Sequence, residues 1–237
     1  FLKNYLGRKY DDLKTVIEVG CGDGGNLFPF FSDGIRAIGC DFDEGAIREG
    51  KNKGLELYLG DIDCLIEKKM KSDLIILPHV LAHISEMDNF LLKISKIINP
   101  NGYLYVESDG IFAKEESDMK NNNLLWYFQF DFITCFELRT LSYVLKKNGF
   151  KVEYGDENIR CISTLQLKEN DSIFIKENLY NNGEVLKKVF EIEKNYLNQG
   201  KIKYFFREIR SYLYLVKNVA IFLIIDLFYL LKFKIKR

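Results

Sequence analysis

The two histidines of the chain, His79 and His83, are its clearest candidates for acid–base chemistry. Imidazole ordinarily exchanges a proton near neutral pH, so it can take one from a hydroxyl or an ammonium group. Their spacing of four places both on one face if the segment is helical. We assign both as candidate general bases, and Glu107 to Asp109 further along the chain as groups that could orient or replace them.

A glycine-rich loop follows a short apolar segment near the start of the chain. The segment Val16–Gly25 reads VIEVGCGDGG, which predicts a buried strand and then a tight turn that lets a ligand approach the backbone closely. Two glycine patterns fit. One is the dinucleotide pattern G-x-G-x-x-G, ending at Gly25, and the other is E-x-G-x-G-x-G, which starts at Glu18 and ends at Gly24.

The acids beside this loop bear on the choice of cofactor. A dinucleotide site holds a pyrophosphate at a helix N-terminus, where a nearby acid is unfavourable. S-adenosylmethionine instead carries a sulfonium and an ammonium group, and an acid can pair with the ammonium directly or through water. Glu18 and Asp23 therefore favour S-adenosylmethionine, held by a loop that contains Gly20, Cys21 and Gly22.

A further acid, Asp41, ends the next predicted strand, 21 positions after Gly20. A carboxylate at that place can accept hydrogen bonds from both ribose hydroxyls of a nucleoside cofactor. This feature suits NAD and S-adenosylmethionine equally. An NAD(P)-dependent oxidoreductase therefore stays an alternative on these residues.

At these positions the chain resembles the class I S-adenosylmethionine-dependent methyltransferases, over roughly residues 15–167. The resemblance implies that Asp61 meets the adenine amino group and that Ile62 packs on the ring, although Asp61 could simply cap a helix. Residues 78–84, PHVLAHI, resemble the family's v-L-x-H-v segment, in which the histidine at His83 can be structural. The cofactor-lining set is completed by Cys21, Phe42 and Leu77.

The elements that must position these residues form an alternating pattern. Apolar segments interleaved with amphipathic ones predict an α/β fold, a doubly wound Rossmann-like sheet of about seven strands. Strands are expected at 16–19, 35–41, 55–62, 72–77 and 103–109, from Val152, and at 162–167, the last two as a hairpin. Helices are expected at 2–14, at 26–31 and around 90–98, the last with Phe90 on its apolar side and Lys93 on its polar side.

The chain divides at about residue 168. Residues 1–168 are expected to form the S-adenosylmethionine-binding methyltransferase domain, and 169–237 a helical, basic and hydrophobic extension. From Lys201 on there are nine basic residues against two acidic ones, a net charge of +7, together with an apolar stripe from Phe205 to Leu230. Such a helix needs an apolar partner surface, which its own domain, a second subunit in a homodimer or a peripheral membrane contact could provide.

Composition narrows the function classes. Apolar residues make up 47% of the chain and the formal net charge is zero, which favours a packed domain and no nucleic-acid partner. The five cysteines show no metal-binding spacing, which indicates reduced thiols, no metal site and a cytoplasmic protein. The aromatic segment 124–132 is expected to be core or part of an acceptor pocket.

We therefore expect methyl transfer to an oxygen or nitrogen of a small molecule or saccharide acceptor. A compact domain with a basic, hydrophobic tail is similar to methyltransferases linked to bacterial surface-glycan (polysaccharide) biosynthesis, and we expect the protein in the cytoplasm, with the inner face of the membrane as one location. A non-catalytic cofactor-binding scaffold protein is the second alternative.

Overall fold

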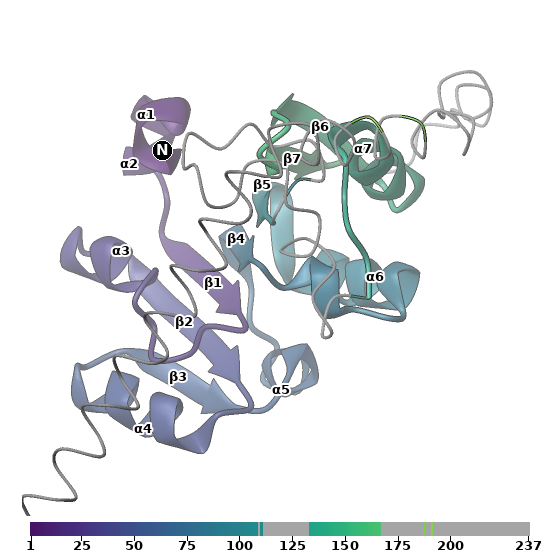
Figure 1. Ribbon diagram of the computed structural model, residues 1–237. Coiled ribbons are helices and arrows are strands. Elements are labelled where there is room, and N and C mark those ends of the chain that lie inside the picture. The colour runs from purple at the N-terminus through teal and green to yellow at the C-terminus, as the bar shows by residue number, and fades with distance from the viewer. Residues whose placement is uncertain (109, 111–132, 167–186, 188–190, 192–237) are drawn as a thin grey trace, which may run out of the picture. The chain divides into compact units, whose positions relative to one another are not determined.

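A seven-stranded sheet organises the described part of the chain, with its strands in the order β3-β2-β1-β4-β5-β7-β6 (Figure 1). Strands β1 to β5 run parallel to one another, whereas β7 lies between β5 and β6 and is antiparallel to both. The bounds are β1 Thr15–Val19, β2 Arg36–Asp41, β3 Glu56–Leu59, β4 Ser72–Pro78, β5 Ile98–Glu107, β6 Phe150–Gly155 and β7 Arg160–Leu165. The predicted doubly wound, Rossmann-like α/β sheet is confirmed, including the hairpin of its last two strands.

The structure, a computed structural model, describes residues 1–108, 110, 133–166, 187 and 191. All of these except Lys187 and Glu191 belong to one unit of the chain. The aromatic segment 124–132 and nearly all of the expected extension 169–237 lie outside the described residues, so the domain boundary at 168 stays a prediction. Among the helices that are described, none has the length and apolar character needed to cross a membrane.

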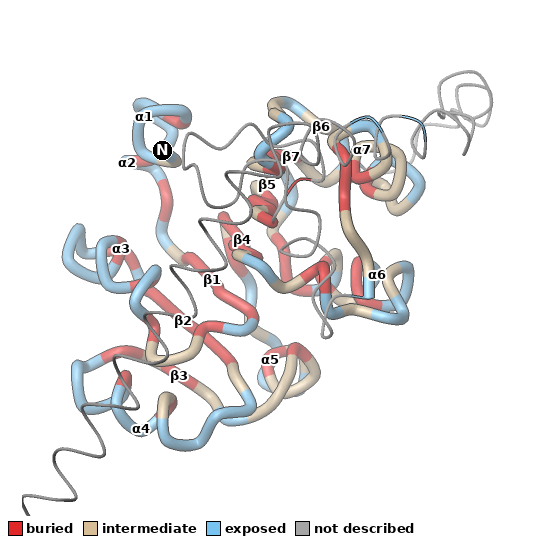
Figure 2. The backbone as a smooth tube through the Cα atoms, viewed as in Figure 1, coloured by how far each residue is buried: buried red, intermediate tan, exposed pale blue. Residues whose placement is uncertain are grey.

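Helices cover both faces of the sheet (Figure 1). Their bounds are α1 Leu2–Leu6, α2 Arg8–Asp11, α3 Phe28–Ser32, α4 Glu44–Asn52, α5 Ile62–Glu67, the 3₁₀ turn η1 Leu81–His83, α6 Met87–Ile97 and α7 Leu138–Lys147. Helices α5 to α7 bury side chains such as Leu65, Leu91 and Leu141 in one core, and α1 to α4 bury a second set in another. Figure 2 shows the buried backbone concentrated in the strands between these layers.

The central strand β4 explains why this sheet forms. Residues 74–77 are almost fully buried because both faces of the sheet are covered, which is why they form an uninterrupted apolar run. Just before them, the Asp73 carboxylate accepts hydrogen bonds from the backbone N–H groups of Lys14 (2.9 Å) and Thr15 (3.0 Å). It also accepts one from the Asn99 side chain (2.8 Å). Asp73 thereby ties together the starts of β1, β4 and β5.

Several element bounds differ from the sequence predictions. The leading segment 2–14 forms two short helices rather than one, because Gly7 adopts a left-handed conformation (φ 55°) between them. Strand β5 begins at Ile98 rather than Tyr103, passing through Asn101 at φ 63°. Strand β3 ends at Leu59, so Asp61 and Ile62 belong to the start of α5 and not to the strand.

Candidate functional site

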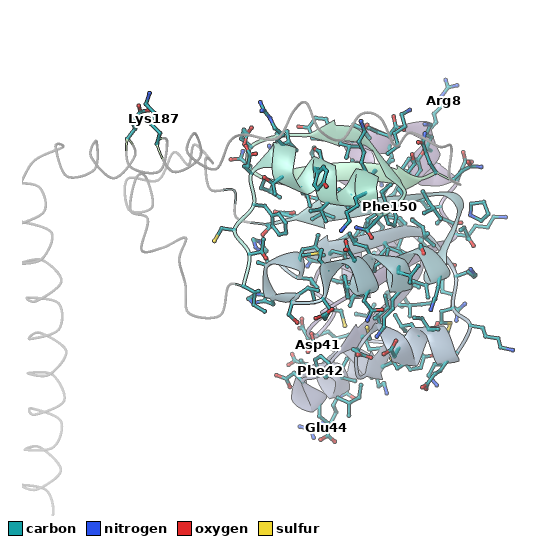
Figure 3. All side chains as sticks on the ribbon, turned by 90° about the vertical axis from the view of Figure 1, so that its right-hand side faces the viewer. Arg8, Asp41, Phe42, Glu44, Phe150 and Lys187 are labelled. Carbon is teal, nitrogen blue, oxygen red and sulfur yellow. The ribbon has the colours of Figure 1, made fainter. Side chains whose placement is uncertain are left out.

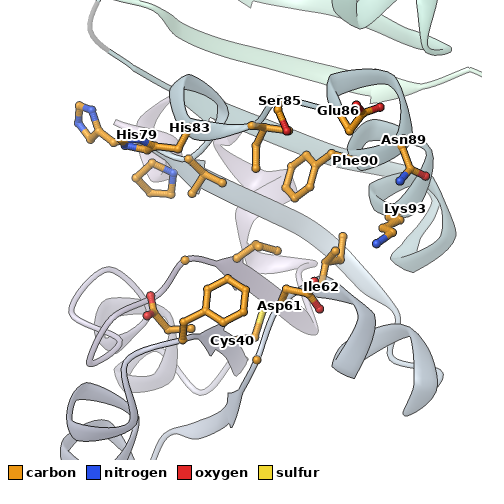
Figure 4. A pocket seen from close by; sticks show the side chains of 18 residues that line it. Cys40, Asp61, Ile62, His79, His83, Ser85, Glu86, Asn89, Phe90 and Lys93 are labelled. Carbon is orange, nitrogen blue, oxygen red and sulfur yellow. The ribbon is translucent and has the colours of Figure 1, made fainter. Parts of the chain in front are cut away.

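The carboxyl ends of β1 and β4 mark the place where the strand order reverses, the usual ligand position in such sheets. A cavity of about 570 Å³ lies there. Its walls come from the ends of β1, β2 and β4, the loop before α5, the segment after β4, and α6 (Figure 4). The predicted site residues that line it are Gly20, Asp41, Phe42, Asp61, Ile62, His79 and His83.

The glycine loop leaves β1 under the segment that follows β4. Gly20 has φ 73°, and a Cβ there would come within 2.9 Å of the Val80 side chain, so only glycine fits this contact. Gly24 also has a positive φ (79°), and a Cβ would collide with Leu55. Gly25 has neither property, since its nearest neighbour is Asp23 at an ordinary 3.5 Å. The loop geometry therefore requires Gly24, the last glycine of the E-x-G-x-G-x-G pattern. It does not require Gly25, the last glycine of the dinucleotide pattern.

Glu18 is buried within β1, with 1% of its surface exposed. Its Oε1 accepts a hydrogen bond from the Asn26 side chain (2.8 Å), whereas its Oε2 is buried without a hydrogen-bond partner among the described residues. Burial raises the pKa of Glu18 to about 8; the Asn26 hydrogen bond opposes this rise, and Asp41 and Asp23 add to it. An acid with an unsatisfied oxygen beside a glycine loop suits a cationic ligand.

Asp41 closes the loop from the end of β2. Its Oδ2 accepts a hydrogen bond from the Gly22 backbone N–H (2.8 Å) and its Oδ1 one from the Asp43 N–H (2.9 Å). Phe42 follows, with 78% of its surface exposed, and it lines the same cavity. Figure 3 shows Asp41 and Phe42 together just before Glu44 and the first turn of α4. A carboxylate and an open aromatic face here fit the ribose and the base of a nucleoside.

Asp61 caps a helix and also lines the cavity, while its contact with adenine stays a prediction. Its side chain caps α5 by accepting a hydrogen bond from the Asp63 N–H (2.9 Å), and the residue also lines the cavity. Ile62 lines the cavity as well, although its side chain is almost fully buried. The capping bond uses Oδ1, so a carboxylate oxygen remains for a ligand amino group.

The two histidines lie on the cavity wall opposite these acids, both with exposed side chains (Figure 4). The segment is not a continuous helix. His79 has a left-handed backbone (φ 56°), with its N–H bonded to the Glu107 carbonyl (2.7 Å), and only residues 81–83 form a helical turn. The helix on which a shared face would depend therefore does not form, and what the two histidines share is the lining of one cavity.

The remaining predicted residues lie behind the cavity or beside it. Cys21 and Leu77 are buried in the two cores, and neither they nor Gly22 are part of the cavity wall. Leu77 is followed by Pro78, which does line the cavity. The Glu107 carboxylate accepts a hydrogen bond from the Tyr105 hydroxyl (2.5 Å), Ser108 is buried, and Asp109 lies outside the described residues.

The contribution of α6 to the cavity is not predicted by the sequence patterns. Phe90 and Lys93 were assigned to opposite sides of this helix, yet both line the cavity, together with Glu86 and Asn89. The Lys93 ammonium also pairs with Asp63 of α5 (2.6 Å). The spacing of these four residues, three or four apart, could have shown that they share one stripe of the helix. Nothing in the pattern showed that the stripe's N-terminal part passes over a cavity.

Taken together, these residues fit S-adenosylmethionine. The acid at Glu18 has an oxygen without a partner, the glycine cradle has no space for side chains at Gly20 and Gly24, and the cavity joins Asp41 to Asp61. Within the described residues, no cluster of three or more metal-ligating side chains occurs. The site can thus hold a nucleoside with a cationic tail and present it to the two imidazoles.

Comparisons with known proteins agree with this geometry. A family model described as a methyltransferase domain matches residues 2–154, more than half of the chain. No curated protein matches the chain. A solved structure of a SAM-dependent methyltransferase from Archaeoglobus fulgidus is similar, with 21% identity, a TM-score of 0.51, and 81% of this chain and 85% of that one covered.

Two further solved structures share the fold. One is a magnesium protoporphyrin IX methyltransferase from Synechocystis with bound SAH (15% identity, TM-score 0.53, 70% of this chain and 80% of that one). The other is a SAM-bound amino pentose methyltransferase from Micromonospora echinaspora (13% identity, TM-score 0.50, 69% and 88%). The oxidoreductase and scaffold alternatives are therefore set aside, and the chain belongs to the methyltransferase-domain family as an S-adenosylmethionine-dependent enzyme.

Proposed function

We propose that this methyltransferase methylates an oxygen or nitrogen of a small molecule or saccharide. The observation that carries the proposal is the cavity that unites the nucleoside-binding acids with His79 and His83. The cofactor supplies an activated methyl group on sulfur. Transfer to a hydroxyl or ammonium also requires removal of a proton, and an imidazole on the cavity wall suits that task.

The chemistry of the similar structures supports a small acceptor without identifying it. One of them is an amino pentose methyltransferase, and another is a mitomycin 7-O-methyltransferase. The identities are 13% and 19%, so these proteins support the acceptor class only by analogy. A role in surface-glycan synthesis, a cytoplasmic location at the inner face of the membrane, and the absence of a nucleic-acid partner belong to the same proposal.

Two measurements test this proposal in sequence. Calorimetry should show binding of S-adenosylhomocysteine and none of NAD, which checks the cofactor half first. Transfer of a labelled methyl group should then occur with a panel of sugars, amino sugars and phenols, and not with oligonucleotides. Labelling of oligonucleotides, with none of the small acceptors labelled, would overturn the proposed acceptor class and leave the cofactor assignment intact.

A further inference from the structure

The buried carboxyl of Glu18 has only part of its hydrogen-bonding capacity filled by the described residues. Its carboxyl is almost completely buried, and only one of its oxygens has a hydrogen-bond partner among the described residues, the amide of Asn26. An ionised carboxylate in this setting is costly, because the buried group accepts one hydrogen bond and pairs with no cation among the described residues. The cost is avoided if the group keeps its proton.

The acidic groups near Glu18 raise its pKa, as burial does. Asp41 faces it from the end of β2, and Asp23 from the glycine loop. Lys53 pairs with Asp23 (2.5 Å), and no cation is among the described groups that act on Glu18. The Cys21 thiol is also close, and burial raises its pKa to about 12, so it stays neutral. Among the described groups that act on Glu18, only the Asn26 amide favours its ionised form.

The cofactor changes this balance because it brings positive charge. Its ammonium and sulfonium groups are cations, and the loop that starts two residues after Glu18 is where they fit. A cation placed nearby favours the charged form of an acid. We propose that Glu18 loses its proton to solvent when S-adenosylmethionine binds, and that Asn26 is the positioning residue that makes this ionisation possible. The step is Glu18–COOH plus cofactor going to the Glu18–COO⁻ complex plus one H⁺.

Asn26 has a specific part in this exchange. Its donated hydrogen bond is the one local interaction that lowers the pKa of Glu18 against the effects of burial and the two neighbouring acids. It also fixes Oε1, so that Oε2 is the oxygen without a hydrogen-bond partner among the described residues. This inference concerns only the cofactor half of the site and does not depend on the acceptor proposed above.

Calorimetry tests the proton directly. Titration of the full-length protein with S-adenosylmethionine in phosphate and in Tris, at one pH, gives the protons released from the difference in apparent enthalpy. With a pKa of about 8 before binding, wild type should release about 0.9 proton at pH 7 and about 0.1 at pH 9. Glu18→Gln should remove this release, and any exchange by the ligand's own amine remains visible in that variant.

A matched control and a second observable complete the test. Asp12→Asn should release as many protons as wild type, because Asp12 is an exposed carboxylate that is not among the groups acting on Glu18. In infrared difference spectra, binding should remove a protonated-carboxyl band that Glu18→Gln lacks from the start. Equal proton release by wild type and Glu18→Gln would overturn the proposal.

Asn26→Leu covers the case in which Glu18→Gln does not fold or bind. Loss of the hydrogen bond should raise the pKa of Glu18 further, so the release-versus-pH curve should move to higher pH and cofactor affinity at pH 7 should fall several-fold. A merely structural role for Asn26 would lower affinity without moving the curve. A curve that stays in place would therefore also contradict the proposal.

Discussion

Asp41 stabilises the glycine loop through its hydrogen bonds and still has acceptor capacity for a ligand. Each of its oxygens already accepts a backbone hydrogen bond, from Gly22 and from Asp43, so the carboxylate shapes the loop that it shares with the ligand. Carboxylate oxygens have more than one acceptor position, which leaves capacity for ribose hydroxyls. We therefore expect the residue to contribute to cofactor affinity through preorganisation of the loop as well as through contact.

Replacing Asp41 by alanine should weaken S-adenosylhomocysteine binding by roughly 1–3 kcal/mol, because charge-assisted bonds to the ligand and the hold on Gly22 are both lost. Isothermal titration measures this loss. The matched control is Asp43→Ala, which removes the cap that accepts the Ala46 N–H (3.0 Å) but leaves the cavity intact. It should lower stability by about 1 kcal/mol and spare affinity. Unchanged affinity in folded Asp41→Ala would refute the ribose assignment.

Replacing either histidine should lower turnover without changing cofactor binding. His79→Ala or His83→Ala should retain cofactor affinity and lose roughly 10²–10⁴ in rate, whichever of the two takes the proton. Single-turnover transfer to a responsive acceptor measures the rate, and calorimetry measures the affinity. If both single variants and the double variant keep near wild-type turnover, neither imidazole is the base, and Glu107 becomes the next residue to replace.

At the scale of elements, strand β1 is held at both ends. The glycine loop follows its carboxyl end. At its amino end, the Asp73 carboxylate accepts hydrogen bonds from the backbone N–H groups of Lys14 and Thr15, a contact that we call the clasp. The loop at one end has positive φ at Gly20 and Gly24. The clasp at the other end joins residues separated by 58 and 59 positions in the chain. The two contacts therefore fix β1 at the carboxyl edge of the sheet, where the cavity lies, and at the opposite edge.

Alanine at Gly24 and at Gly25 should have opposite effects. Gly24→Ala forces a left-handed alanine against Leu55, which should cost roughly 2–4 kcal/mol of unfolding free energy and weaken cofactor binding. Gly25→Ala meets no close neighbour and has no positive φ, so it should be neutral or add about 0.4–1 kcal/mol. Urea denaturation compares the two. Equal destabilisation by both would contradict the loop geometry.

Removing the clasp should destabilise the protein in a pH-dependent way. Burial raises the pKa of Asp73, but hydrogen bonds from Asn99, Lys14 and Thr15 outweigh it and hold that pKa below its ordinary value. Its stabilising effect is therefore present above the ordinary pKa of Asp and lost as the pH falls through the lower, folded value. Asp73→Ala should cost about 1–3 kcal/mol at pH 7 and much less near pH 3.

Urea midpoints at the two pH values measure the clasp, with Asp12→Ala as the control. Asp12 is an exposed carboxylate just before β1, so its loss should change the midpoint little at either pH. A cost at Asp73 that is the same at pH 3 and pH 7 would mean that packing, rather than the ionised carboxylate, accounts for it.

Sequence reasoning succeeded where one local rule decides the outcome. Strand ends with an acid, such as Asp41, and glycines in an E-x-G-x-G-x-G loop were located because backbone sterics and chain order determine them. It failed where two elements meet. The placement of Phe90 and Lys93 on one cavity wall depends on how α6 crosses the sheet, which no pattern within α6 encodes. The unsatisfied oxygen of Glu18 likewise depends on packing from both sides.

At the scale of the whole molecule, every described residue that lines the cavity comes before position 94. The strands that follow complete the sheet without lining the cavity. This separation makes the predicted boundary at residue 168 testable, because binding should not require what comes after it.

The fragment 1–168 should bind S-adenosylhomocysteine within about twofold of the full-length chain, a difference of roughly 0.4 kcal/mol. It should also lack any self-association or vesicle binding that the full-length chain shows, as measured by light scattering and by co-sedimentation with anionic vesicles. We expect the extension to pack on its own domain or to form a homodimer. Vesicle binding by the full-length chain that persists in high salt would favour the membrane instead, and a tenfold loss of affinity in the fragment would contradict the boundary.

The antiparallel course of β7 determines where the chain leaves the sheet. β7 starts opposite Glu107, at the edge where the cavity lies, and ends opposite Phe150, where the Gln166 N–H bonds to the Gly149 carbonyl (2.8 Å). Its six residues carry the chain roughly 17 Å away from the ligand edge. The exit point is therefore a natural graft junction. We therefore expect that segments fused after Gln166 can be exchanged while the described walls of the cavity stay in place.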